Sequence, residues 1–252
     1  MTVFEPLAWG CLIGGVLVVG AVAGALLPAR ERVATTLTIF GGGLLLGALA
    51  FELVVEAERH AGAPLVAGGL AVGALAYLAI DWALTRDEGR ADLRRALQAG
   101  VAGGRSRGGD EQAARGKSIA LGIFMDGVPE TAALGLTIAE GELAASLLAG
   151  ILVSNLVESY GATEPIVASG RSRGYPVALF AGIALALIAA LVVGATLLED
   201  ARPSVIGFAE ALAGGAIFAT VLVAIVPHAF AEVSRWAAVA AMAGLVAAYL
   251  LA

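Results

Sequence analysis

Long apolar runs, separated by short polar or glycine- and proline-containing breaks, cover most of the chain. Each run has about 17 to 28 residues, and a helix needs about 20 apolar residues to cross the hydrocarbon core of a bilayer. The breaks coincide with turn or charge signals, such as Gly62-Ala63-Pro64 and Glu140-Gly141-Glu142. The pattern predicts eight spanning helices, at residues 7–28, 33–56, 65–84, 118–139, 143–168, 176–198, 204–231 and 236–252.

The composition agrees with an integral membrane protein. Of the 252 residues, 60% are apolar and 14% are charged, and the mean hydropathy is +0.91. The one long polar stretch, 86–117, has too few apolar residues to build a core, so residues 1–252 are predicted to form a single all-α transmembrane domain. Cys11 is the only cysteine, which excludes an intrachain disulfide. Residues 7–27 lack the basic flank of a signal peptide and are expected to be a retained helix.

The basic residues predict how the helices are oriented. All but two of the 15 Lys and Arg residues lie in the breaks after the first, third, fifth and seventh runs, and the exceptions are Arg59 and Arg202. Because Lys and Arg in short loops stay on the cytoplasmic side, we expect loop 86–117 to be cytoplasmic and both termini to be extracytoplasmic. The expected location is the cell membrane, crossed several times.

A weak internal repeat relates the second and seventh helices. Gly42-Gly43 precedes Glu56 by the same interval that separates Gly214-Gly215 from His228. The two helices are expected to run in opposite directions, as the halves of an inverted repeat do in many transporters. A chance match between two helices rich in small residues is the alternative.

Acidic residues occur inside the apolar runs, whereas no Lys or Arg does. An ionised side chain near the bilayer centre costs about 2.5 to 3.5 kcal/mol on insertion scales, so such residues usually face a cavity and carry function. Without a basic partner in the spans, these acids must be protonated, hydrated or bound to a cation. They are Glu52, Asp126, Glu130, Glu158, Glu164 and Glu210.

The acids of the fourth and fifth helices have the spacing of a shared site. Asp126 and Glu130 are four residues apart, as are Ser154 and Glu158, and residues at that spacing share a helix face. Both pairs fall near the middle of their helices, and Asn155 adds an amide. Oxygen ligands of this kind suit divalent cations. The sequence therefore predicts a cation site between these two helices.

Pro129, between the two acids of the fourth helix, adds a backbone group. A proline inside a helix removes one hydrogen bond and frees the carbonyl four residues earlier, here that of Met125. In lipid, a freed carbonyl must find a partner or line a wet cavity. A simple kink is the alternative, and the flanking acids favour the cation site over it.

The fourth helix resembles that of the ZIP family of divalent metal transporters. The family carries a His-Asn-x-Pro-Glu-Gly pattern there, and residues 126–131 of this chain read DGVPET. Pro129 and Glu130 match the pattern, and Asp126 stands in place of the histidine.

The fifth and second helices extend the resemblance. The family's fifth helix carries a His-x-x-Pro-Glu pattern, and residues 154–158 read SNLVE, with Asn155 and Glu158 matching and Ser154 in place of the histidine. In the second helix, Glu52 stands where a family stretch has a histidine. The sixth helix has none of the carboxylates that many family members place there.

The resemblance implies a 3+2+3 arrangement, in which helices one to three and six to eight are inverted repeats around helices four and five. It also implies a metal path between helices four and five. The main site would comprise Asp126, Glu130, Ser154 and Glu158; Asn155 would contribute to a neighbouring site, and Glu52 would lie on the way in.

The implied function is transport of Zn²⁺, or of the related ions Mn²⁺ and Fe²⁺, toward the cytoplasm by alternating access. Carboxylate and hydroxyl in place of imidazole harden the site and move its preference from Zn²⁺ toward Mn²⁺ and Fe²⁺. We expect no enzymatic activity and no cofactor besides the transported metal. The expected partners are that ion and the lipid bilayer, with a homodimer left open, and no nucleic acid.

Two other functions stay open at this point. In a proton-coupled carrier of a small solute, the buried acids would carry protons. An intramembrane aspartyl protease would need two aspartates, here Asp81 and Asp126, although Asp126 lacks a Gly-x-Gly-Asp setting. Of the two histidines, His60 is expected in a solvated loop, and His228 is a candidate ligand on the exit side.

Overall fold

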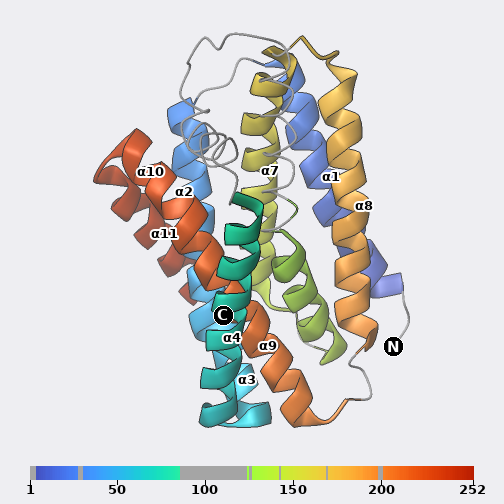
Figure 1. Ribbon diagram of the computed structural model, residues 1–252, viewed down its shortest axis with the longest axis vertical. Coiled ribbons are helices and arrows are strands. Elements are labelled where there is room, and N and C mark those ends of the chain that lie inside the picture. Colours follow the sequence, from blue (N-terminus) through green and yellow to red (C-terminus); the bar gives the residue numbers. More distant parts are fainter. Residues whose placement is uncertain are drawn as a thin grey trace.

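Every residue in regular secondary structure is helical in the part of the chain that the structure, a computed structural model, describes (Figure 1). The all-α prediction is confirmed for that part. The described residues are 4–27, 31–85, 124, 127–141, 143–168, 170–197 and 201–252, so the predicted loop 86–117 lies outside them. The helices are α1 (Phe4–Leu26), α2 (Glu31–Ala48), η1 (Leu49–Leu53), α3 (Val54–Ala61), α4 (Ala63–Thr85), an unlabelled helical segment at 127–139, α7 (Ala145–Ala168), α8 (Gly174–Leu197), α9 (Pro203–Thr220), η2 (Val221–Ile225), α10 (Val226–Val233) and α11 (Trp236–Leu251).

Six described helical stretches are long and apolar enough to cross a membrane. α11 is a shorter apolar helix, and the predicted fourth span, 118–139, is described only in part. A multi-pass membrane protein is therefore supported, while the count of eight spans stays a prediction. The six are Phe4–Leu26, Arg32–Ala61, Ala63–Ala83, Ala145–Thr163, Gly174–Thr196 and Pro203–Val233.

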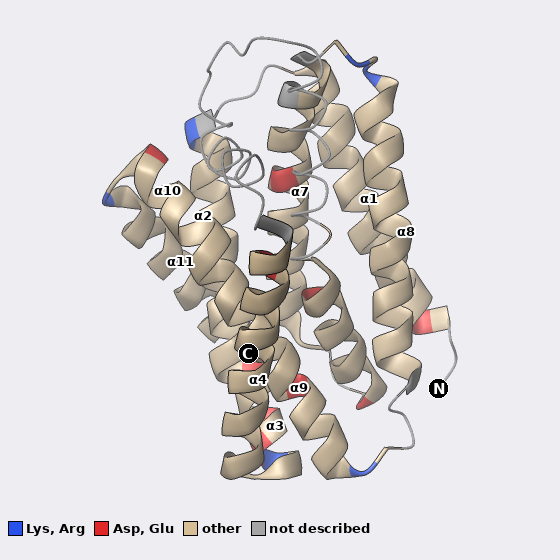
Figure 2. Cartoon of the chain, viewed as in Figure 1, with Lys and Arg blue, Asp and Glu red and all other residues tan. Residues whose placement is uncertain are grey.

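The outside of the bundle is apolar, as a lipid environment requires. Large side chains such as Leu75, Leu185 and Leu250 stay exposed on three different helices. Figure 2 shows the Lys and Arg residues of the described part of the chain at the two ends of the bundle, with acidic residues also between the ends. Between the two ends, the charged residues of the described part are thus acidic, as the sequence indicated.

Two long rods each contain a π-helical turn at the same place. The first is α2, η1 and α3, and the second is α9, η2 and α10. Each element of the second rod begins 172 residues after its counterpart, at 31 and 203, 49 and 221, and 54 and 226. The rods run in opposite directions, since α3 lies at the lower end of the first and α10 at the upper end of the second (Figure 1). The match found in the sequence therefore extends to the geometry of these helices.

The packing of the two rods is also reciprocal. α2 packs against α11, and α9 packs against α4, in both cases through glycines that lie against a backbone carbonyl of the partner helix. A side chain at any of these glycines would overlap that carbonyl, so each contact needs the missing Cβ. The glycine and carbonyl pairs are Gly43 with Ala241 and Gly244 with Phe40 for α2 and α11, and Gly215 with Leu70 and Gly73 with Leu212 for α9 and α4.

The contact of α4 with α9 makes a testable prediction on one helix. A Cβ on Gly73 would overlap the Leu212 carbonyl oxygen, whereas a Cβ on Gly68 would meet nothing within 4 Å. We expect Gly73→Ala to lower the thermal unfolding temperature of the purified protein, because overpacking costs about 1 to 3 kcal/mol. Gly68→Ala is the matched control and should be neutral or slightly stabilising, since alanine favours a helix by about 0.5 to 1 kcal/mol. Equal unfolding temperatures for the two variants would contradict this packing.

The helix that carries half of the predicted site, α7, is held from two sides. It packs against α1 and against α2, and Gly20 and Gly24 of α1 lie against the α7 carbonyls of Leu156 and Tyr160. The segment 127–139 packs on α8 instead, through Gly135 and Gly194. These close contacts fix the polar residues of α7 within a tightly packed interior.

Candidate cation sites

The predicted ligands lie on the segment 127–139 and on α7. Glu130 is 3% exposed on the first, and Ser154 and Asn155 are 2% and 1% exposed on the second. Glu158, one turn further along α7, is half-buried. The fifth predicted ligand, Asp126, lies outside the described residues, as does Met125.

Chain connectivity puts Glu130 and Ser154 at the same depth. Residues 140–144 join the two helices, and a connection this short favours an antiparallel helical hairpin. Glu130 is nine residues before the end of the segment and Ser154 is nine residues after the start of α7, which is roughly 14 Å of helix in each case. By the same reckoning Glu158 lies one turn further, roughly 20 Å from the connection.

Two hydroxyl groups of α7 donate their protons to the backbone and stay able to accept. Ser154 Oγ donates its proton to the Ile151 carbonyl at 3.3 Å, and Ser159 Oγ donates to the Asn155 carbonyl at 2.6 Å. A hydroxyl that has given its proton to the backbone keeps two lone pairs for a further partner. Among the described residues, Asn155 Nδ2 is buried without a hydrogen-bond partner. On the facing segment, Thr131 Oγ1 likewise donates to the Gly127 carbonyl at 2.7 Å.

Glu52, the sixth predicted ligand, lies elsewhere. It belongs to η1, and its carboxylate accepts from Ser146 Oγ at 2.8 Å, from the Ser146 backbone N–H at 3.3 Å and from the Leu147 N–H at 3.4 Å. It therefore caps the N-terminus of α7, where the helix dipole favours a negative charge. Ser146 precedes Ser154 by eight residues, roughly 12 Å along the helix, so Glu52 is not at the level of Ser154.

This cap should be measurable as stability. We expect Glu52→Ala to lower the free energy of unfolding by about 1 to 2 kcal/mol, the usual value of an N-cap, because it leaves donors of the first turn of α7 unpaired. Glu58→Ala on α3 removes an exposed acid and is the control. Thermal unfolding in detergent compares the two variants, and a smaller loss for Glu52→Ala than for Glu58→Ala would contradict the capping role.

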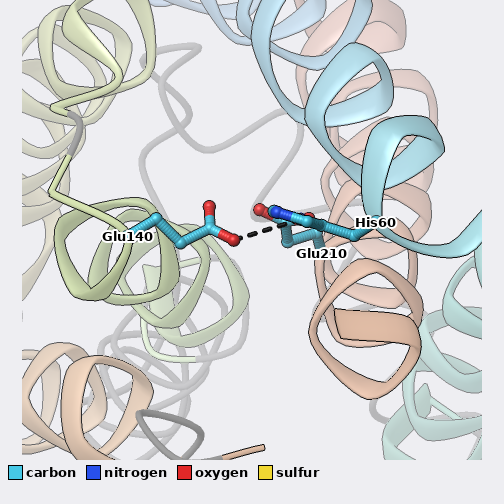
Figure 3. A group of neighbouring side chains, drawn as sticks. All are labelled: His60, Glu140 and Glu210. Atoms are coloured by element: carbon cyan, nitrogen blue, oxygen red, sulfur yellow. Dashed lines mark hydrogen bonds and ion pairs between the residues drawn. The ribbon is translucent and has the colours of Figure 1, made fainter. Parts of the chain in front are cut away.

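His60 is not in a solvated loop, as the sequence predicted, but in the last turn of α3. Its Nδ1 is 3.1 Å from Glu140 Oε1 and 3.3 Å from Glu210 Oε2 (Figure 3). Its Nε2 is 3.7 Å from Glu56 Oε1. Glu140 comes from the turn after the segment 127–139, and Glu210 comes from α9. The ligand atoms of His60, Glu140 and Glu210 all lie within 4.8 Å of one another.

Only part of this group was visible in the sequence. Glu56 and His60 are four residues apart on one helix, a spacing that puts both on one face. Glu210 is distant in the chain and is brought to His60 by the packing of α9 on α3, whereas Glu140 reaches it from the turn after the segment 127–139. The other histidine, His228, lies on α10 with Nε2 3.5 Å from Thr35 Oγ1 of α2.

Comparison with known proteins adds no family. No protein-family model and no curated protein matches the chain. The likeness to the ZIP family therefore rests on the residues themselves, chiefly Pro129, Glu130 and Glu158.

Proposed function

We propose that this chain is a divalent metal transporter and a divergent member of the ZIP family. It moves Zn²⁺, or Mn²⁺ or Fe²⁺, toward the cytoplasm by alternating access. The observation that carries the proposal is Glu130, a carboxylate that is 3% exposed on the segment 127–139, nine residues from the connection to α7, as Ser154 is on α7. Asp126 and Glu158 complete a set of oxygen ligands of the kind that such ions take.

The repeat supports the transport mechanism. Two rods with matching elements, running in opposite directions, fit the inverted repeats by which many transporters open alternately to the two sides. In the 3+2+3 arrangement of the proposal, each rod is the middle helix of one repeat. The central pair, segment 127–139 and α7, carries the ion between them. The termini face away from the cytoplasm, as the positions of Lys and Arg indicate.

The proposal has a direct test in liposomes. The purified chain is reconstituted, and uptake of Zn²⁺, Mn²⁺, Fe²⁺, Cd²⁺ and Mg²⁺ is measured in competition, with empty liposomes as the blank. We expect saturable uptake of at least one transition metal ion. If no divalent ion is taken up, and a small solute is taken up in response to a pH gradient without metal, the proton-coupled carrier is favoured instead. Metal-independent peptide cleavage, lost in Asp81→Asn and Asp126→Asn alike, would favour the protease.

A further inference from the structure

A second group of metal-ligating side chains lies away from the central pair, where α3 ends and α9 begins. His60, Glu140 and Glu210 reach the same point from three different elements (Figure 3). His60 lies in the last turn of the first rod, Glu210 lies seven residues after the start of the second, and Glu140 lies in the turn between segment 127–139 and α7. The group therefore joins the two rods and the pair formed by segment 127–139 and α7 at one end of the bundle.

The hydrogen bonds of His60 cannot serve both acids. Its Nδ1 faces Glu140 Oε1 at 3.1 Å and Glu210 Oε2 at 3.3 Å. One imidazole nitrogen carries at most one proton, and that proton points along a single direction. Two carboxyl groups thus face one donor in a partly dry place, where a shared proton or a bound cation relieves their mutual repulsion.

A metal ion satisfies this geometry. Zinc bonds to nitrogen and carboxylate oxygen are about 2.0 to 2.2 Å long, so neighbouring ligand atoms of a tetrahedral site are about 3.3 to 3.6 Å apart. The measured separations of 3.1 and 3.3 Å are close to that edge length. We propose that His60 Nδ1 and carboxylate oxygens of Glu140 and Glu210 bind a divalent transition metal ion such as Zn²⁺ at a second site, with water as the fourth ligand.

The deepest ligand points to the same conclusion. Glu210 is fully buried, and its Oε1 has no hydrogen-bond partner among the described residues. A buried carboxylate oxygen without a partner is expensive, and buried charges are normally paired or bound to metal. The side chains of His60 and Glu140 are 24% and 15% exposed, so water and an ion reach the group from one side.

The surroundings also prepare the histidine as a ligand. Glu56 Oε1 lies 3.7 Å from His60 Nε2 and favours the proton on that nitrogen, which leaves the lone pair on Nδ1 toward the two acids. Arg59 is engaged with Glu56 Oε2 at 2.6 Å. Arg59 therefore neutralises the orienting acid, and a bound ion displaces any proton that Glu140 and Glu210 share.

Gly207 brings the two rods close enough for this site. A Cβ there would lie 2.6 Å from the Ala57 carbonyl oxygen and 2.9 Å from His60 Cβ, so α9 approaches α3 only because the side chain is missing. Gly207 precedes Glu210 by three residues, and residues at that spacing lie on one face of the helix. The same contact therefore presents Glu210 to His60.

This site goes beyond the proposed function, and it can be tested without transport. The full chain is purified in detergent, stripped of metal with a chelator and titrated with Zn²⁺ by calorimetry, in a Glu130→Ala background that removes a central ligand. We expect about one Zn²⁺ to bind, and His60→Ala or Glu140→Gln to weaken that binding at least about tenfold, since even outer-shell partners of metal ligands are worth 10- to 100-fold. Glu58→Gln, an exposed acid on the same helix, is the matched control and should leave the affinity unchanged.

A spectroscopic measurement distinguishes the loss of a histidine ligand from the loss of folding. With Co²⁺ in place of Zn²⁺, the visible absorption bands should lose intensity in His60→Gln and not in Glu58→Gln, while both variants keep the helical circular dichroism of the parent. Zn²⁺ binding that persists unchanged in His60→Ala and Glu140→Gln would overturn the site, as would a Glu130→Ala background that binds no metal. Absence of metal uptake by the parent protein, with this binding intact, would count against the transporter proposal alone.

Discussion

Glu130→Gln is expected to reduce divalent metal uptake into liposomes by about a hundredfold or more, because changing even an outer-shell partner of a metal ligand costs about 10- to 100-fold. Glutamine keeps the shape and volume of the side chain, so a residue that is 3% exposed is replaced without a cavity. It loses the negative charge, and a neutral amide is a far weaker ligand for a dehydrated ion. The loss should therefore be in transport rather than in folding.

The control variant tests whether the loss of a buried carboxylate, and not of any carboxylate, reduces metal uptake. Glu58→Gln removes an acid that is exposed on α3, and its uptake should equal that of the parent. Both variants are compared with the parent by thermal unfolding and by initial uptake rates at several metal concentrations. A Glu130→Gln variant that is folded and transports at the parental rate would remove the central site from the mechanism.

The six described spans were predictable because they follow from the length and the composition of apolar runs. A run of about 20 apolar residues has few stable alternatives to a spanning helix, and the breaks at Gly62 and Arg235 fall between helices as expected. At the first of these breaks, Gly62 alone separates α3 from α4, with a positive φ of 74° that glycine adopts without strain.

The π-helical turns were not predictable in the same way. η1 and η2 insert a wider turn into helices whose apolar pattern continues through them. Such turns are often found at functional sites, and η1 contains Glu52, which reaches across to cap α7. The cap joins residues 94 positions apart, and a local sequence pattern carries no information about such a contact.

The second metal site was missed for a related reason, and the repeat explains why it lies at one end only. The two rods share their backbone geometry but not their ionisable side chains. The residue of the first rod that corresponds to Glu210 is Thr38, whose hydroxyl donates to the Ala34 carbonyl of its own helix. The counterpart of His60 in the second rod is Glu232. The histidine and the acids of the proposed site therefore lie where α3 meets α9, whereas the corresponding positions of the other rod hold different residues.

Ser154→Cys is expected to change which ion is preferred, because it replaces a hard oxygen by a soft sulfur at the same place. Ser154 is 2% exposed, and cysteine has nearly its shape, so the fold tolerates the change. A thiolate favours Zn²⁺ and Cd²⁺ over Mn²⁺. We expect the ratio of Cd²⁺ to Mn²⁺ uptake to rise about tenfold or more, which corresponds to about 1.4 kcal/mol of differential binding.

The experiment uses a Cys11→Ser background, because the native thiol is exposed and would bind Cd²⁺ itself. Thr137→Cys is the matched control: it places a thiol at a buried position of the segment 127–139, seven residues and roughly 10 Å beyond Glu130. It should leave the uptake ratio unchanged. An equal rise in both variants would mean that any buried thiol near the path changes selectivity. An unchanged ratio in Ser154→Cys would place the ion away from Ser154 and leave Glu130 and the other predicted acids as its ligands.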